Sequence, residues 1–158
     1  MQRACFAVLC LLLLSGSALA GELSRLMPDK VGALDRVQLV TGADAQAEVD
    51  RLHNKSLQAE ASAIGRYARP NERAAEVWVS RVVTESEARR QTGLMVHKMY
   101  DNPKSPFSNP VRLEHNGLAV YRFMGMGQAH FVWFSGDLVW WVSAQPKDGQ
   151  AFLDAFCR

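Results

Sequence analysis

Alternation of apolar and polar positions predicts β-strands through most of the chain. In AAEVWVSRVV, Val77 and Val79 face opposite to Trp78, which is the period of two that a strand requires. The same reasoning gives strands over 37–42, 57–70, 118–124, 129–134 and 137–143.

Helix signals separate these strands. Thr84 and Glu87 form a capping box in TESE, so a helix should run from Glu85 to about Met99. Good helix formers predict an earlier helix over 43–53, and the closing segment PKDGQAFLDAFCR predicts a short helix that buries Phe152, Leu153 and Phe156. The stretch DNPKSPFSNP holds three prolines and therefore excludes a helix or a central strand.

Turn signals in GMGQAHFVWFSGDLVWWVS indicate the register of the last strands. A two-residue turn at Ser135-Gly136 would place Trp133 opposite Leu138 and Phe131 opposite Trp140. A turn through the preceding glycine loop would place Arg122 opposite Phe131, so that Arg122 lies between Phe131 and Trp140. Its guanidinium could stack on the rings, its stem could cover them, or it could anchor an anion at the mouth of a pocket.

Both faces of this predicted ribbon are mainly apolar, because side chains alternate along each strand. Helices should cover one face, and the other needs a cover too: the N-terminal arm and the proline-rich loop, another subunit or an apolar ligand. One face would carry Val120, Arg122, Met124, Ala129, Phe131, Trp133, Leu138, Trp140 and Val142, and the other Ala119, Tyr121, Phe123, His130, Val132, Phe134, Asp137, Val139, Trp141 and Ser143.

The pattern as a whole predicts an α+β fold. We expect a single antiparallel sheet of about five to six strands with three helices, mainly on one face, in the order β-α-β-β-α-β-β-β-α. Residues 37–158 would form this one domain, and residues 21–36 an extended N-terminal arm.

The first twenty residues have the pattern of a secretory signal peptide. Arg3 precedes the apolar run CFAVLCLLLL, and Ala18-Leu19-Ala20 predicts cleavage after Ala20. The run is too short to span a bilayer, so no transmembrane anchor should remain and the protein should be periplasmic or secreted. Loss of Arg3 lowers the formal net charge from +2 to +1, which gives no electrostatic case for nucleic-acid binding.

Cleavage would also remove Cys5 and Cys10 and leave Cys157 as the last cysteine. One cysteine cannot form an internal disulfide. Cys157 is then either a packed residue of the last helix or a thiol that can pair with another chain.

Two chemical alternatives arise from methionine and histidine. Met124, Met126 and His130 could ligate copper through thioether and imidazole groups if the glycine loop folds back, but methionine in a core is more often filler. A small hydrolase could use His53, His97, His115 or His130 as a base, yet no catalytic motif accompanies any of them, and we assign no catalytic residue.

Three runs carry a resemblance: HNKSLQAEASAIGRYARPNERAAEVWVS, ESEAR…MVHKM and PFSNP…GMGQAHFVWFSGDLVWWVSA. Over roughly 49–144 the chain resembles a family of small secreted α+β proteins of bacteria and archaea that has no assigned activity. Asn54 stands where that pattern often has glycine. The resemblance implies an exported domain and marks six positions: His53, Lys55, Gly125, Gly127, Gln128 and His130.

These observations favour an exported, non-catalytic binding domain over an enzyme. Its partner would be a second copy of the chain, another protein or a hydrophobic small molecule held on an aromatic sheet face. The candidate binding residues are Arg122, Phe131, Trp133, Trp140, Trp141, His130, Gln128, His53 and Lys55.

Overall fold

The computed structural model describes residues 21–53 and 58–158, and these form both strands and helices. The elements are β1 (Lys30–Val31), β2 (Leu34–Thr41), α2 (Gly42–His53), β3 (Ala61–Ala68), β4 (Ala75–Arg81), α3 (Glu85–Asp101), β5 (Phe107–His115), β6 (Leu118–Gly125), β7 (Gln128–Ser135), β8 (Leu138–Ala144), the short 3₁₀ turn η1 (Pro146–Asp148) and α4 (Gly149–Phe156).

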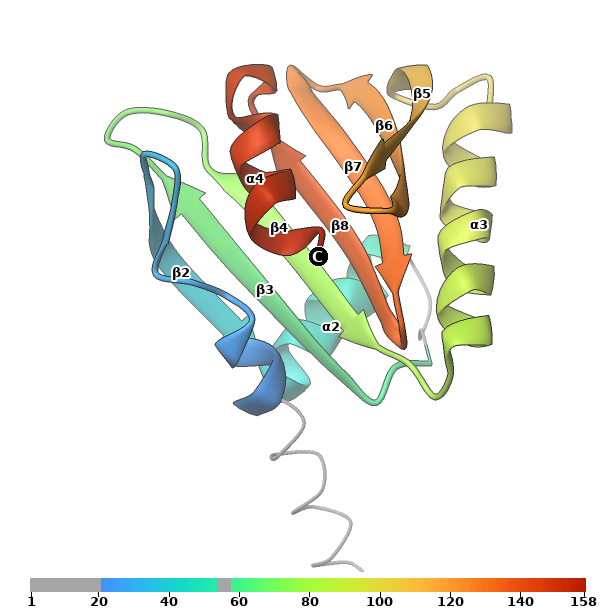
Figure 1. The fold of residues 1–158 in the computed structure, drawn as a ribbon, viewed down its shortest axis with the longest axis horizontal. Helices are drawn as coiled ribbons and strands as arrows, with labels where there is room; N and C mark the ends of the chain where they lie inside the picture. The colour runs from blue at the N-terminus through green and yellow to red at the C-terminus, as the bar shows by residue number, and fades with distance from the viewer. Residues whose placement is uncertain (1–20, 54–57) are drawn as a thin grey trace, which may run out of the picture.

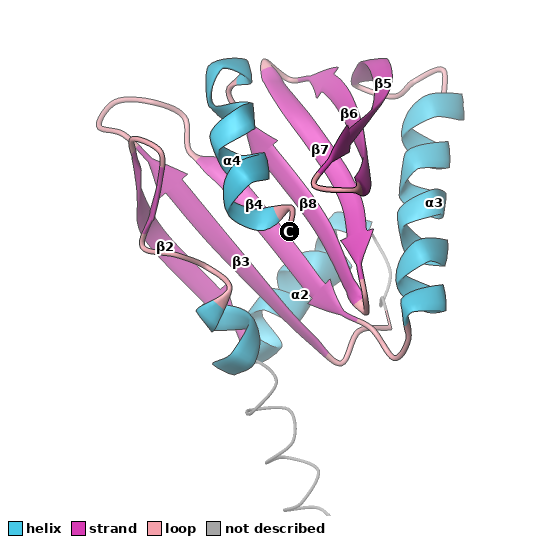
Figure 2. Ribbon diagram, in the orientation of Figure 1, coloured by secondary structure: helices cyan, strands magenta, loops and turns pink. Residues whose placement is uncertain are grey.

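All the described strands join one antiparallel sheet, in the order β1-β2-β3-β4-β8-β7-β6-β5 (Figures 1 and 2). The sheet therefore has eight strands rather than the five or six predicted. The two that sequence reasoning missed are β1, which has two residues, and β5, which begins within the proline-rich stretch. An edge position tolerates Pro110 because the missing N–H breaks no ladder between two neighbours, and the β5–β6 register shifts between Ser108 and Val111.

Helices cover both faces of this sheet, which corrects the expectation that they lie mainly on one. Figure 1 shows α4 in front of the sheet and α2 behind it. On the side of α2, α3 packs Met99 against Phe123 and Val132. We call the α4 side the covered face; it carries Val77, Val79, Phe131, Trp133, Trp140 and Val142. The opposite side, with Trp78, His130, Val132, Trp141 and Ser143, is the groove face.

The N-terminal segment completes the cover of the covered face. Residues 21–25 form a helical turn and 30–36 enter a hairpin, so the segment 21–36 is not the extended arm that the sequence suggests. Leu23 is fully buried and Met27 nearly so in the core beneath α4. Arg81 on β4 pairs with Glu22 at 2.6 Å and holds the turn against the sheet.

Aromatic residues form the centre of the covered face. Phe152 and Phe156 of α4 stack on each other and meet Tyr67 edge to face. The hydroxyl of Tyr67 donates to the carbonyl of Pro28 at 3.0 Å, so this buried polar group is satisfied. The N-terminal segment, the sheet and α4 thereby share one core.

The β7–β8 hairpin differs in register from the prediction. Trp133 pairs with Trp140 and Phe131 with Val142, and the two-residue turn is Gly136-Asp137, one position later than expected. Gly136 has a φ of +55°, a conformation that glycine adopts without strain. Because pairing shifts by two residues, each side chain keeps its predicted face.

Two local predictions are confirmed. Arg122 pairs with Phe131 across β6 and β7, as the glycine-loop turn requires. Thr84 caps α3 by accepting a hydrogen bond from the backbone N–H of Glu87 at 3.2 Å. The helix then continues to Asp101, two residues beyond the predicted end, and buries Ala88 on its inner face.

The C-terminus packs into the core. Cys157 is fully buried, and burial raises the pKa of its thiol to about 11. Arg69 forms a bidentate pair with Asp148 of η1 at 2.6 and 3.0 Å, which fastens the start of α4 to the β3–β4 loop. None of the helices in the described residues has the length and apolar character that crossing a membrane would need.

Candidate functional site

A groove runs across the groove face between α2 and α3. It arises because α2 packs chiefly on β3 and β2, whereas α3 packs on β7, β8 and β5, so that on this face the central strand β4 lies between the two helices. Two adjoining cavities of about 180 and 500 Å³ make up the groove. Both are lined by Leu52, Trp78, Met95, Lys98 and Trp141, so we treat them as one site, the tryptophan groove.

Local sequence positions the two walls. Gly42, at a φ of +64°, lets the chain turn directly from β2 into α2. The Thr84 cap starts α3 close behind the end of β4. Leu52 of α2 and Leu94 of α3 are 53% and 43% exposed, so each wall offers apolar surface to the groove.

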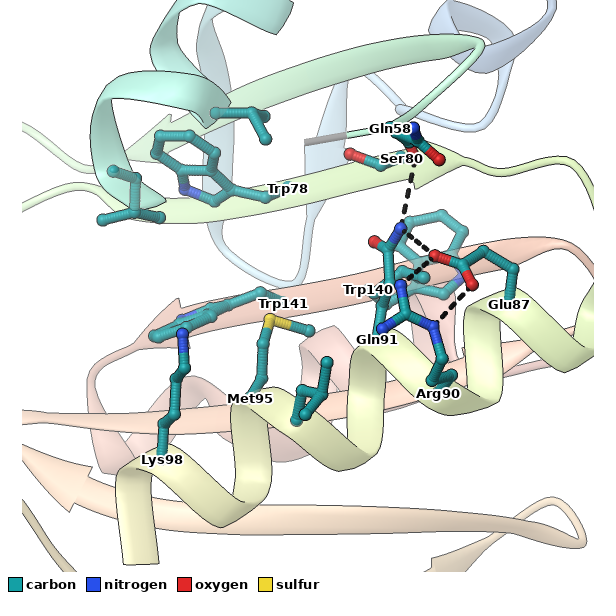
Figure 3. Close-up of a pocket in the computed structure, with 14 residues that line it drawn as sticks. Gln58, Trp78, Ser80, Glu87, Arg90, Gln91, Met95, Lys98, Trp140 and Trp141 are labelled. Carbon is teal, nitrogen blue, oxygen red and sulfur yellow. Dashed lines mark hydrogen bonds and ion pairs between the residues drawn. The ribbon is translucent and has the colours of Figure 1, made fainter. Parts of the chain in front are cut away.

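Two tryptophans form the floor. Trp78 on β4 and Trp141 on β8 are direct cross-strand partners and are half-buried. Trp78 Nε1 donates to Glu76 at 3.2 Å, and Trp141 Nε1 donates to Ser143 Oγ at 2.9 Å. Glu76 and Ser143 are themselves cross-strand partners. Both indole N–H groups are therefore satisfied by the floor, and the two rings offer apolar surface to the groove (Figure 3).

A chain of hydrogen bonds fixes the orientation of Trp141. Ser143 Oγ lies 2.9 Å from His130 Nδ1, and His130 Nε2 lies 3.0 Å from the carbonyl oxygen of Gly125. A carbonyl only accepts, so Nε2 carries the proton and Nδ1 accepts from the serine hydroxyl, which in turn accepts from the indole. Burial lowers the pKa of His130, and the neutral ring satisfies every bond in this chain.

Polar residues close one end of the groove. Glu87 accepts from Arg90 at 2.6 and 2.7 Å and from Gln91 at 2.8 Å. The same Gln91 amide also donates to the carbonyl of Gln58 at 3.1 Å, bridging α3 to the segment before β3 (Figure 3). Arg90 and Gln91 together lower the pKa of Glu87 to about 2. The polar groups at this end therefore bond to one another, and we call this cluster of Glu87, Arg90 and Gln91 the Glu87 plug.

The other end is open and basic. Lys98, in the last turn of α3, reaches toward Trp141 in Figure 3. Arg73 lines the same end and donates to the carbonyl of Met126 at 2.6 Å. The carboxylate of Glu76 is already engaged there by Arg66, at 3.1 Å.

The structure divides the predicted binding residues between the two faces. Trp141, His130 and Gln128 border the groove, and Gln128 donates to the carbonyl of Ala74 at 3.2 Å. Phe131 and Trp133 are core residues of the covered face. The same holds for Trp140: it borders the groove floor, but its ring stacks on Trp133 in that core.

Arg122 also lies on the covered face, at the strand β6. It is opposite Phe131 but not beside Trp140, because Trp140 pairs with Trp133. Its Nε is buried without a hydrogen-bond partner among the described residues. Among the described residues, the cation–π contact is made instead by Arg89, whose guanidinium carbon lies 5.4 Å from the centroid of the Phe134 ring.

Two further predicted positions cannot be placed. His53 ends α2, but its side chain lies outside what the structure describes, and Lys55 lies outside the described residues. Of the other glycine-loop positions, Gly125 supplies the carbonyl that His130 binds, and Gly127 takes a φ of +76° in the β6–β7 turn.

The three copper candidates do not come together. Met124 packs against the covered-face core, whereas His130 lies on the groove face. Met126 occupies the turn between β6 and β7 and is 54% exposed. Over residues 21–53 and 58–158, no cluster of three or more His, Cys, Asp or Glu could hold a metal ion.

Sequence reasoning missed most of the groove walls. Trp78 showed one signal, because it alternates with Val77 and Val79 and so had to face away from them. No sequence signal places Leu52, Met95 and Lys98 together, because their proximity depends on where α2 and α3 pack on the sheet. Comparison of the chain with protein-family models, curated proteins and solved structures finds no significant match, so the family resemblance stays a prediction.

Proposed function

We propose that this is an exported, non-catalytic binding protein that holds a small apolar molecule in the tryptophan groove. The observation that carries the proposal is the Trp78–Trp141 pair, half-buried on the floor with both indole N–H groups already satisfied. Protein ligand sites are commonly apolar hollows of roughly 300–1,000 Å³ with few polar groups, and the larger cavity, at about 500 Å³, falls in that range.

Binding would be driven by removal of apolar surface from water. A ligand that covers about 200 Å² of apolar surface gains about 5 kcal/mol before the entropic cost of association is subtracted. The floor is also preorganised, because the Ser143–His130–Gly125 chain holds the Trp141 indole in one orientation. Little ordering is therefore required when the ligand binds.

The same hydrogen bonds favour binding over the hydrolase alternative. His130 and Ser143 are at hydrogen-bond distance, as a base and a nucleophile would be. The serine hydroxyl, however, accepts from the indole of Trp141, and the second ring nitrogen of His130 binds a carbonyl in place of a carboxylate. Both residues are almost fully buried. This arrangement suits a structural support of the floor better than an attacking group.

Titration with a neutral apolar fluorophore, N-phenylnaphthylamine, tests the proposal. We expect saturable enhancement of its emission, and Trp78→Ala and Trp141→Ala should each weaken binding at least about fivefold through lost apolar contact. Tyr100→Ala is the matched control, because Tyr100 is an exposed aromatic of α3 that does not line the groove.

Two results would count against the proposal. One is the absence of saturable binding by a folded protein, and the other is equal affinity in all three variants. Light scattering on the same samples would reveal a dimer. If that dimer dissociates in Trp78→Ala, the groove is an interface between two copies and the small-molecule role is wrong.

A further inference from the structure

The charged side chains that line the tryptophan groove include more cations than carboxylates. Glu87 is neutralised by Arg90 within the closed end. Glu76 pairs with Arg66, which lies outside the groove lining and also pairs with Glu48, and Glu76 accepts from Trp78 as well. Both lining carboxylates are thus committed to partners.

Two cations remain. No ion pair of Lys98 is found among the described residues, although Lys98 borders both cavities. The hydrogen-bond partner of Arg73 is the neutral carbonyl of Met126, so its charge is uncompensated there. These two groups line the larger cavity, whereas the apolar residues Val49, Leu94 and Val139 line the smaller one.

We infer that the ligand is a small anionic amphiphile, whose apolar body lies on the tryptophan floor and whose carboxylate is held by Lys98 and Arg73 at the open end. This inference rests on the proposed binding function. It adds the orientation of the ligand in the groove: the apolar tail lies toward the Glu87 plug and the carboxylate head toward Arg73.

The groove length sets the size of the body. Its floor extends along β4 from Ser80 in the smaller cavity to Glu76 in the larger one. Four residue steps of an extended strand span about 13 Å, which is comparable to a medium-chain fatty acid. The indole N–H groups of the floor already have partners, so they cannot donate to a ligand head group. A neutral head group beside Lys98 and Arg73 would therefore lose hydration without gaining an ionic partner, whereas a carboxylate would gain one.

Head-group selectivity is the direct test. Displacement of bound N-phenylnaphthylamine should be measured with decanoate, decanol and decylammonium, which share one chain length, each below its micelle concentration at pH 7.5. We expect decanoate to bind about fivefold to tenfold more tightly than decanol, decylammonium to bind weakest, and added salt to shrink the difference.

Variants that remove one positive charge test whether Lys98 and Arg73 cause the preference for decanoate over decanol. Lys98→Gln and Arg73→Gln should each lower decanoate affinity about threefold more than they lower decanol affinity, while Arg73→Lys should retain most of the selectivity. Lys104→Gln is the matched control, because it removes a charge from the exposed loop beside the groove without lining it. Lys98 and Arg73 are exposed, so folding should survive, and thermal melting checks this.

Equal binding of decanoate and decanol would overturn the anionic head and leave apolar binding intact. Stronger binding of decylammonium would overturn it as well. If the folded protein shows no saturable binding of the fluorophore itself, the proposed function fails.

Discussion

The rings of Trp133 and Trp140 stack on the covered face, with centroids 5.6 Å apart and planes 4° from parallel. On the opposite face, Trp78 and Trp141 pair across β4 and β8 but remain half-buried. The four tryptophans of the chain thus divide into a pair that holds the fold together and a pair that floors a groove.

The two pairs should respond differently to truncation. Trp133→Ala should lower the free energy of unfolding by about 3–5 kcal/mol, because it empties a fully buried site. Trp78→Ala should cost about 1–2 kcal/mol, since its side chain is only partly buried. Urea denaturation measures both values, and a larger loss from Trp78 would show that its ring is core.

The N-terminal turn should behave as part of the core. Leu23→Ala removes a fully buried side chain and should lower the free energy of unfolding by about 2–5 kcal/mol. Leu94→Ala deletes the same atoms from a partly exposed site and should cost under about 1 kcal/mol. Equal losses in chemical denaturation would mean that residues 21–27 do not pack on the sheet.

His130 should make stability depend on pH. Its pKa is lowered in the folded protein by burial, while the unfolded chain has the ordinary value of about 6.5. Its contribution is therefore complete above about pH 6.5 and is lost as the pH falls from there toward the lowered value. Denaturation midpoints at pH 8 and pH 5.5 should differ less for His130→Gln than for the wild type. An unchanged difference would show that His130 titrates alike in both states.

The Arg69–Asp148 pair should hold α4 in place. Asp148→Asn should lower the melting temperature at pH 7 more than Lys147→Gln, because Lys147 forms only an exposed pair with Glu72. Arg69 holds the pKa of Asp148 below its ordinary value, so this stability is present above that value, about 3.9, and is lost as the pH falls below it. The two variants should converge in strongly acidic buffer, and persistence of the gap would point to another cause.

The thiol of Cys157 should be inert in the folded protein. Because its pKa is raised to about 11 and the side chain is buried, little thiolate forms at pH 8. In a variant with Cys5 and Cys10 replaced by serine, Ellman's reagent should react slowly until urea unfolds the chain. Rapid labelling without denaturant would favour the exposed thiol that the sequence left open.

The strand pattern was readable because each strand's alternation is local. The spacing of two alone predicts that Val77 and Val79 share one face of the sheet and that Trp78 lies on the other. The face of every residue in β7 and β8 was likewise correct even though the register was two residues off, since pairing shifts of two preserve the faces. The edge strand β5 was missed because its proline, Pro110, and its bulge hide the alternation.

The amino-acid sequence by itself determined an α+β chain with a doubly apolar antiparallel ribbon, because side-chain polarity at a period of two is a local property. Only the tertiary structure decided which aromatic face became core and which became a groove. That outcome depends on β4 pairing with β8 and on α2 and α3 settling apart over the sheet, contacts between segments far apart in the chain that no local pattern specifies.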